Sequence, residues 1–323
     1  MLDRYGRVIN YLRISVTDRC NLRCCYCMPE GVQDVGMKNI LTFEEIWEIV
    51  RTGVSLGITH IRITGGEPLM RKGCGDLIRG IREIPGVETI TMTTNGVLLE
   101  NYGKQLKEAG VDGVNISLDT LDPEEFYKIT GKRELQEVLA GIRAAKTAGL
   151  PVKLNAVNRK ELDPIPLVRY AQEENLPIRF IEMMPVGYGK KYVGRSNEEL
   201  RETLEAVCGK AECMTNREEL SRMGSGPAVY YQFSDLKVPV GFISAIHGKF
   251  CDTCNRVRLT AEGYLKLCLC YDEGEDLRRV LREGEKENLR TIMEQTIFQK
   301  PAAHCFEHPA EMTETHEMAK IGG

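Results

Sequence analysis

The sequence predicts an α/β protein, and two observations carry that prediction. Over residues 1–220, apolar strand-like segments alternate with amphipathic helical segments. A turn-rich stretch at 224–227 then introduces shorter strand-like segments of a different texture. Alternation of strands and helices implies right-handed parallel βαβ units, whose buried strands are apolar runs. The chain therefore divides into a βα-repeating part, residues 1–220, and a smaller α+β part, residues 221–323.

The βα-repeating part starts with a strand near 12–16, followed by a cysteine-rich loop. A helix begins near Thr42, because Thr42 and Glu45 form a capping-box pattern ahead of apolar residues at helical spacing. The elements that follow are strands at 60–64, 88–93, 113–118, 152–157 and 178–183, and helices near 98–109, 134–148 and 163–175. A closed barrel needs eight strands. The six found here predict a partial (β/α)6 TIM-like barrel, and a doubly wound open sheet remains the alternative. Either fold places its chemistry at the carboxyl ends of the strands.

The α+β part contains three segments that look like antiparallel strands, at 230–233, 240–246 and 257–260. Two charged helical stretches follow near 275–283 and 286–298, and then a tail rich in Pro, His and Glu. The histidines of this tail fit no compact metal site, and we expect them to be ordinary tail residues: His304, His308 and His316. These features predict a small C-terminal α+β domain with an extended tail.

Composition excludes several classes of protein. The formal net charge of the 323 residues is -4, so no basic excess points to nucleic acid or to an anionic membrane. The N-terminus lacks the apolar stretch of a signal peptide, and no run approaches the ~18 apolar residues that would span a bilayer. We therefore expect a cytoplasmic protein with no membrane partner. The 12 cysteines would stay reduced there, so their clustering indicates metal rather than disulfides.

The first cysteine set has the spacing C-x3-C-x2-C and follows the first strand directly. Its members are Cys20, Cys24 and Cys27. Thiolates are the ligands that iron–sulfur clusters use, and three ligands for four irons leave one iron open to bind a second molecule. A zinc knuckle or reduced core thiols are the alternatives. Cys25 is adjacent to Cys24 and should point elsewhere, so we interpret it as a bystander.

The second set, Cys251, Cys254 and Cys268, has the spacing C-x2-C-x13-C. Three cysteines again leave an open position if they hold an iron–sulfur cluster. Cys270 could supply the fourth thiolate that a closed zinc site requires. Spacing alone leaves zinc and a cluster as equal alternatives, and it leaves the choice between Cys268 and Cys270 open.

The first set, Tyr26 and the segment Gly65-Gly66-Glu67-Pro68 together resemble the signature of radical S-adenosylmethionine (SAM) enzymes. In that family the open iron chelates the amino and carboxylate groups of SAM, and an electron from the cluster releases a 5'-deoxyadenosyl radical. A partial barrel is typical of these enzymes. The resemblance implies that SAM contacts Tyr26, Gly66, Ser117 and Met184.

A more specific resemblance lies around the second set. The segment 250–259 is similar to the C-terminal cluster segment of the GTP 3',8-cyclase family, the molybdenum cofactor biosynthesis proteins A (MoaA). The similarity extends over nearly the whole chain, through 17–21, 62–69, 93–96, 115–119, 153–157, 179–182 and the terminal Gly322-Gly323. It implies two 4Fe-4S clusters, the second of which binds the guanine of GTP through its free iron.

The resemblance also assigns residues to the substrate. GTP would contact Arg13, Arg62, Thr93, Lys153, Arg256, Val257 and Arg258. Arginine and lysine neutralise a triphosphate best in a partly desolvated cavity. The family places Arg256, Arg258, Gly322 and Gly323 at the reacting centre, so we hypothesise that the tail folds back near the two arginines.

The implied reaction is radical cyclisation of GTP to (8S)-3',8-cyclo-7,8-dihydroguanosine 5'-triphosphate, the first step of molybdenum cofactor biosynthesis. It implies an external electron donor and transfer of the product to cyclic pyranopterin monophosphate synthase, and it is compatible with a homodimer. Two alternatives stay open: another radical SAM enzyme with an auxiliary cluster, and a non-catalytic iron–sulfur or zinc protein. The stretch between Cys27 and Thr42 is shorter than the family pattern, which puts the loop near SAM in question.

Overall fold

A single twelve-stranded sheet organises the chain in the computed structural model, which describes residues 1–31, 36–284 and 286–322. The order of its strands is β12-β11-β10-β1-β2-β3-β4-β5-β6-β9-β8-β7, so the sheet is open, with β12 and β7 at its edges. The strands are β1 (Tyr11–Ser15), β2 (His60–Thr64), β3 (Thr89–Thr94), β4 (Gly113–Ser117), β5 (Val152–Asn158), β6 (Ile178–Glu182), β7 (Ala211–Cys213), β8 (Val229–Phe233), β9 (Val240–Ile243), β10 (Arg256–Leu259), β11 (Tyr264–Lys266) and β12 (Gly274–Asp276).

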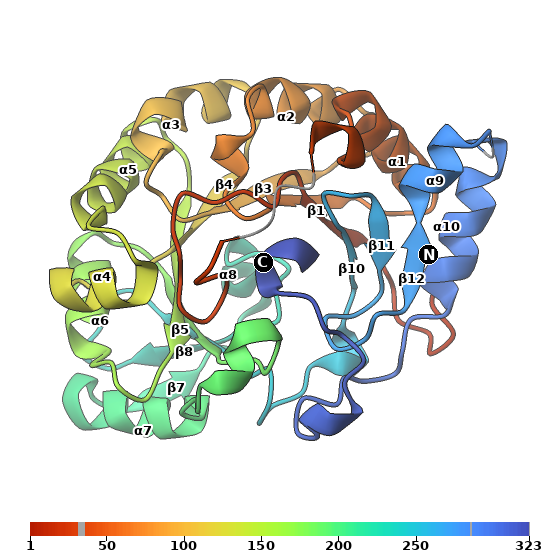
Figure 1. The fold of residues 1–323 in the computed structure, drawn as a ribbon. Coiled ribbons are helices and arrows are strands. Elements are labelled where there is room, and N and C mark those ends of the chain that lie inside the picture. The colour runs from red at the N-terminus through yellow and green to blue at the C-terminus, as the bar shows by residue number, and fades with distance from the viewer. Residues whose placement is uncertain (32–35, 285, 323) are drawn as a thin grey trace.

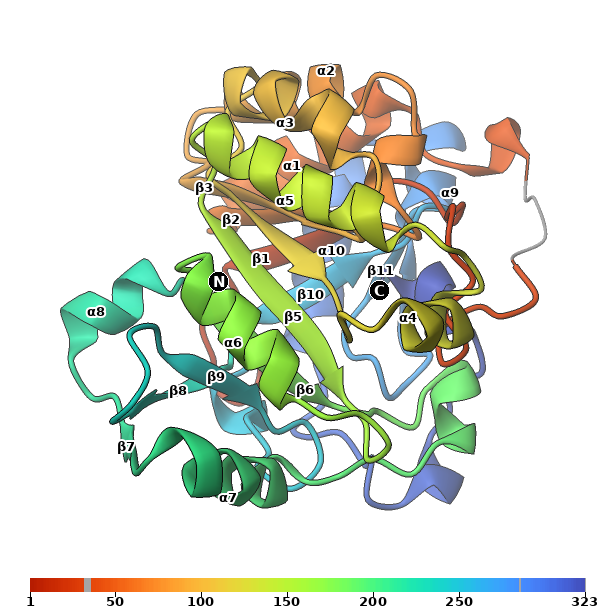
Figure 2. The same cartoon turned by 90° about the vertical axis from the view of Figure 1, so that its left-hand side faces the viewer.

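The sheet curves into a partial barrel, and helices cover its outer side. Figures 1 and 2 show α1, α2, α3, α5 and α6 outside the curve, whereas the C-terminal residues lie within it. The helices are α1 (Phe43–Ser55), α2 (Cys74–Arg82), α3 (Leu99–Glu108), α4 (Pro123–Thr130), α5 (Leu135–Thr147), α6 (Ile165–Glu173), α7 (Asn197–Cys208), α8 (Arg217–Arg222), α9 (Leu277–Arg282) and α10 (Leu289–Phe298). Helices on one side and a polar interior on the other distinguish this fold from a doubly wound sheet.

The predicted partial barrel is confirmed. Strands β1 to β6 pair in parallel and in sequence order, within one or two residues of the predicted bounds. The capping box at the start of α1 is present, because Glu45 N donates to Thr42 Oγ1 and Thr42 N donates to a Glu45 carboxylate oxygen. Four helices escaped prediction: α2, α4, α7 and α8.

The expectation that the C-terminal strands are antiparallel is confirmed in part. Strand β8 pairs antiparallel with β9, and β10 pairs antiparallel with β11. The other edges differ from the expectation, because β9 pairs in parallel with β6 and β10 pairs in parallel with β1. The physical reason is that the open barrel leaves backbone N–H and C=O groups unpaired along the outer edges of β1 and β6. Strands β10 and β9 of the C-terminal part hydrogen-bond to these two edges. The division at residues 220 and 221 stays a prediction.

The two faces of the central strands differ in polarity. In β1, Leu12 and Ile14 point outward and are fully buried under the helices, whereas Tyr11, Arg13 and Ser15 alternate with them on the inner face. The same alternation runs through the neighbouring strands, so the apolar core lies between sheet and helices. The inner strand positions give the cavity polar side chains such as Arg13, Arg62 and Asn155, and apolar side chains such as Ile181 and Met184 line the rest of it. Among the described residues, no helix is long and apolar enough to cross a membrane.

Helix α5 packs so closely on the turn after β3 that a methyl group does not fit. A Cβ on Gly141 would lie 2.2 Å from the Gly96 carbonyl oxygen. We expect Gly141→Ala to lower the free energy of unfolding by about 1–3 kcal/mol, although alanine is the better helix former. Urea unfolding measures the change. Gln136→Ala, at an exposed site of α5, is the control and should stay within about 0.5 kcal/mol of the parent. Equal stability of the two variants would contradict the packing argument.

Candidate active site

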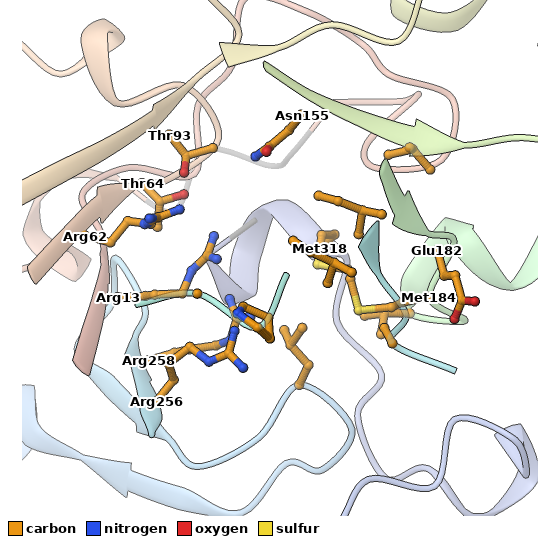
Figure 3. Close-up of a pocket in the computed structure, with 18 of the residues that line it drawn as sticks. Arg13, Arg62, Thr64, Thr93, Asn155, Glu182, Met184, Arg256, Arg258 and Met318 are labelled. Carbon is orange, nitrogen blue, oxygen red and sulfur yellow. The ribbon is translucent and has the colours of Figure 1, made fainter. Parts of the chain in front are cut away.

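The inner face of the sheet and the C-terminal segments surround a cavity of ≈ 350 Å³. All six predicted metal ligands line it: Cys20, Cys24, Cys27, Cys251, Cys254 and Cys268. Figure 3 shows the arginines on one side of the cavity and Met184, Met318 and Glu182 on the other. The fold therefore brings both cysteine sets and the four predicted arginines, Arg13, Arg62, Arg256 and Arg258, to one chamber.

The first cysteine loop is held by backbone and side-chain donors. Cys27 N donates to the Cys24 carbonyl oxygen at 2.9 Å, which closes the loop into a turn. The Cys20 sulfur accepts from Leu22 N at 3.4 Å and from Asn95 Nδ2 at 3.7 Å. Cys25 does not line the cavity, and its sulfur accepts from Arg159 at 3.5 Å.

The three thiols of the first set resist ionisation in the absence of a cation. Burial raises the pKa of Cys20 to about 11 and that of Cys27 to about 12. Burial and the neighbouring Cys27 raise the pKa of Cys24 well above its usual range. Among the described residues, no three His, Cys, Asp or Glu side chains are placed to hold a single ion. The fit to an iron–sulfur cluster therefore rests on the donor chemistry, because three soft thiols that share one cavity favour a cationic iron group.

The remaining predicted SAM contacts surround this loop. A Cβ on Gly66 would lie 2.5 Å from the carbonyl oxygens of both Asp18 and Arg19, so only glycine allows the strand end to approach the loop this closely. The Tyr26 hydroxyl donates to Asp119 Oδ2 at 2.7 Å, and Asp119 Oδ1 accepts from Val157 N at 2.8 Å. Ser117 and Met184 also line the cavity.

The second cysteine set carries a different electrostatic environment. Burial opposes ionisation of Cys254, but the charges of Lys300 and Arg256 outweigh it and lower the pKa of the Cys254 thiol to about 7. Cys268 lines the cavity, whereas Cys270 does not. The Cys270 sulfur lies 3.1 Å from the Cys305 sulfur, in an apolar cluster against which Cys268 also packs. The role of Cys268 as the third ligand stays a prediction, which its place in the cavity wall favours.

Three arginines form a row on the inner face of the sheet. Strand register pairs Arg13 with Arg258 on one side and with Arg62 on the other. Arg256 is the first residue of β10 and pairs with Tyr11. Burial, Arg258 and Arg62 lower the pKa of Arg13 well below its usual range. Burial and Arg256 lower the pKa of Arg258 to about 10. Like charges forced together in a buried site indicate a binding site for a polyanion.

The other predicted substrate residues differ in placement. Thr93 lines the cavity, and its hydroxyl oxygen is buried with no hydrogen-bond partner among the described residues. Lys153 donates to the Met223 carbonyl oxygen at 2.8 Å. Val257 is buried in the core. Neither Lys153 nor Val257 is among the residues that line the cavity, and their contact with a substrate stays a prediction.

The C-terminal tail enters the same chamber. The Gly322 carbonyl oxygen accepts from Arg13 at 3.2 Å, from Arg258 at 3.3 Å and from Thr64 Oγ1 at 3.4 Å. Upstream, Glu314 forms a fully buried ion pair with Lys266. Gly323, the last predicted residue, lies outside the described residues.

Comparison with known proteins adds independent information. Residues 14–164 match the Radical SAM superfamily, and residues 176–306 match the family Molybdenum Cofactor Synthesis C. A GTP 3',8-cyclase of Petrotoga mobilis is 42% identical over 328 residues, covering 100% of both chains, and one from Pelotomaculum thermopropionicum is 44% identical over 332 residues with the same coverage. This chain belongs to the GTP 3',8-cyclase family of radical SAM enzymes.

The solved structure of Streptococcus suis SuiB bound to S-adenosylmethionine has a TM-score of 0.65 with this chain at 14% identity, covering 97% of this chain and 77% of that one. This similarity shows the fold alone. Membership of the family gives the chain SAM and an iron–sulfur cluster as cofactors. The family identification from the sequence is confirmed.

Several cavity residues were missed from the sequence. Arg179 is buried on β6 and donates to Asn155 Oδ1 at 2.9 Å and to Asn115. The signal was present, since polar residues recur at every second position of these strands. His304 is buried and lines the cavity, so it is not the ordinary tail residue that was expected. No local pattern distinguished it from the other tail histidines.

Glu67 is a buried carboxyl group that ties the strand-end loop together. It accepts from Asn95 N at 2.7 Å, Leu69 N at 3.1 Å and the Thr94 hydroxyl at 2.9 Å. Burial nevertheless raises its pKa from 4.5 to about 7. The folded protein therefore keeps a proton that the unfolded chain loses between these two pH values.

This difference in proton binding predicts a pH-dependent stability. As pH rises from about 4.5 to about 7, the free energy of unfolding of the metal-free protein should fall by on the order of 1–3 kcal/mol. Glu67→Gln should flatten this part of the profile in urea unfolding at several pH values. Glu83→Gln, at an exposed site at the end of α2, is the control and should leave the profile unchanged. A parent protein that gains stability across this window would contradict the assignment.

Proposed function

We propose that this protein converts GTP to (8S)-3',8-cyclo-7,8-dihydroguanosine 5'-triphosphate, the first step of molybdenum cofactor biosynthesis. The observation that carries the proposal is the joint placement of two three-cysteine sets and a row of arginines in one cavity. Relatives named GTP 3',8-cyclase that match over the full chain support it. Co-localisation matters because a radical reaction needs its two partners held in line.

The first cysteine set would hold a 4Fe-4S cluster and leave one iron for SAM. When bound, the cluster and SAM supply a 5'-deoxyadenosyl radical. Gly66 allows the backbone to approach the ligand, and Tyr26 is oriented by its hydrogen bond to Asp119. Ser117 and Met184 complete the predicted SAM contacts from the strand ends.

The second set would hold a second 4Fe-4S cluster through Cys251, Cys254 and Cys268. Its open position would receive the guanine of GTP. The positive charges of Lys300 and Arg256 favour the thiolate of Cys254 at neutral pH, which suits a metal ligand. The contact of Cys270 with Cys305 supports this set of three ligands over a closed zinc site that would include Cys270.

The arginine row would bind the triphosphate. Arg13, Arg62 and Arg258 are paired across three neighbouring strands. Successive phosphate groups of the triphosphate could therefore each contact a guanidinium group. Thr93 would donate its unpartnered hydroxyl, and Lys153, Arg256 and Val257 complete the predicted contacts. Gly322 and Gly323 would cover this end of the cavity and exclude water.

Three features of the reaction lie outside the chain itself. An external electron donor would reduce the first cluster. The product would pass to cyclic pyranopterin monophosphate synthase. We further propose that the protein works as a homodimer, to be tested by light scattering.

The first experiment is release of 5'-deoxyadenosine by anaerobically reconstituted, reduced protein with SAM. GTP should enhance release strongly over ATP and over no nucleotide, and the product should have the mass of GTP. About eight irons per chain with matching sulfide are expected.

Arg13→Gln should weaken GTP-dependent release at least about tenfold, because it removes a charged hydrogen-bond donor from a buried site. Arg51→Gln, whose side chain is 57% exposed on α1, is the charge-matched control and should have no effect.

Other outcomes would assign another function. Release that is indifferent to nucleotide would retain radical SAM chemistry and move the substrate elsewhere, toward an auxiliary-cluster enzyme of another kind. One zinc with about four irons would make the second site structural. No release from a fully loaded cluster would favour a non-catalytic protein.

The tail supplies a separate prediction. Because the Gly322 carbonyl oxygen meets Arg13 and Arg258, removal of Gly322 and Gly323 should expose the cavity to water. We expect the truncated protein to bind SAM normally but to lose product formation at least about tenfold. Product assay and SAM binding are measured together. Lys320→Ala, which keeps the backbone of the tail, should retain activity. Full turnover after truncation would refute a role for the tail.

A further inference from the structure

The first ten residues of the chain lie outside both family matches, which begin at residues 14 and 176. They nevertheless pack on the C-terminal half. Asn10 N donates to the Asn255 carbonyl oxygen at 3.2 Å, and Asn255 Nδ2 donates to Asn10 Oδ1 at 2.8 Å. Arg4 N donates to the Phe298 carbonyl oxygen at 3.2 Å. The N-terminal segment is thus bound to the residue after Cys254 and to the end of α10.

Arg7 lies at the centre of this contact. Its side chain is only 6% exposed, and its Nε donates to Asp3 Oδ2 at 2.6 Å. One guanidinium nitrogen donates to the carbonyl oxygens of Cys251 at 2.9 Å and Ala302 at 2.8 Å. The other donates to the Pro301 carbonyl oxygen at 2.7 Å. A single side chain therefore joins the N-terminus, the start of the second cysteine loop and the stretch after α10.

The stretch after α10 in turn borders the second set. Lys300 and His304 are buried and line the same cavity as the three cysteines. The Lys300 ammonium donates to the Leu267 carbonyl oxygen, one residue before Cys268. Both residues lie within two positions of the carbonyl groups that Arg7 holds. Their placement beside the cysteines depends on the same backbone that Arg7 fixes.

We propose that Arg7 is the positioning residue of the second cysteine site, and that the N-terminal segment is part of that site. Arg7 also lines the cavity, but it acts through its contacts with Cys251 and with residues 300–302 and not as a metal ligand. The proposal rests on the proposed function only in taking Cys251, Cys254 and Cys268 as metal ligands. It holds whether their metal is iron or zinc.

The arrangement needs arginine in particular. A planar guanidinium carries five N–H donors in a fixed fork, so it can bridge a carboxylate and three carbonyl groups at once. A lysine ammonium at the same place has three donors on a flexible stem and no planar fork. The buried Asp3 carboxylate balances the charge, so Arg7→Lys keeps the ion pair while it loses the bridge.

The test is metal content of full-length, anaerobically reconstituted protein. In a background that lacks the first set through Cys20→Ala, Cys24→Ala and Cys27→Ala, the parent should retain only the metal of the second set, about four irons. Addition of Arg7→Lys should reduce that metal at least about fivefold. In the chain with both sets, Arg7→Lys should leave the spectrum of the first cluster and its change on SAM addition intact.

Arg282 offers a control with a similar hydrogen-bond pattern. Its Nε donates to Glu45 at 2.6 Å, and its terminal nitrogens donate to the carbonyl oxygens of Lys38 at 2.7 Å and Ile40 at 3.1 Å. The Arg282 side chain is more exposed than that of Arg7, at 37% against 6%, and it does not line the cavity. Arg282→Lys should therefore leave metal content unchanged.

The outcomes separate this inference from the proposed function. The parent metal analysis tests whether the second set holds a cluster or zinc, and the Arg7 comparison tests positioning in either case. Parent-level metal and an unchanged second-site spectrum in Arg7→Lys would overturn the proposal. Equal loss of both sites would also overturn it, because Arg7 would then support the whole fold. If Arg7→Lys fails to fold, Asp3→Asn keeps the guanidinium and should lower metal at the second set alone.

Discussion

The parallel register of β10, β1 and β2 is the constraint on which the rest of the site depends. It aligns Arg258, Arg13 and Arg62 at one level of the inner wall, where burial and mutual repulsion lower the pKa of Arg13. Burial of three neighbouring positive charges costs free energy in the protein without substrate. Only oxygen atoms that are negatively charged or belong to carbonyl groups offset that cost. The Gly322 carbonyl oxygen supplies one acceptor to two of these arginines. The repulsion among the arginines is therefore greatest where a triphosphate would bind and relieve it. This is expected of a binding site that is preorganised for a polyanion.

The C-terminal half completes the site rather than standing beside it. It contributes β10, which brings Arg258 to the row, and the loop that carries Cys251 and Cys254. It also contributes β9, which extends the other edge of the barrel through β6. An open barrel leaves two edges with unpaired backbone groups, and here one C-terminal segment covers both. Since both cysteine sets open into one cavity, the fold itself sets the separation between the two reacting partners.

Local patterns were sufficient for the parts of the protein that local physics determines. Hydrophobic periodicity and the capping box at Thr42 located the six parallel strands and α1, and the cysteine spacings singled out six cysteines that line the cavity. Pairing of β9 and β10 was not predictable, because a strand's partner depends on contacts far apart in sequence. Arg7 escaped for the same reason, since the carbonyl groups that give it a role come from residues 251 and 301–302. The spacing left Cys268 and Cys270 equivalent, and only the packing of Cys270 against Cys305 separates them.

Buried charge pairs position the irregular ends of the chain. Arg7 and Asp3 fix the N-terminal segment, and Lys266 and Glu314 fix the tail. Such pairs add little net stability, because desolvation offsets most of the attraction, but they penalise every arrangement that leaves one charge unpaired. Apolar contacts tolerate sliding, whereas an ion pair with directed hydrogen bonds defines one position. In the described terminal segments regular structure is short, a β-bridge between Leu2 and Val8 and a 3-10 helix over Met318–Ile321, and both segments reach the cavity. The protein therefore uses buried ions where its secondary structure ends and its chemistry requires a defined geometry.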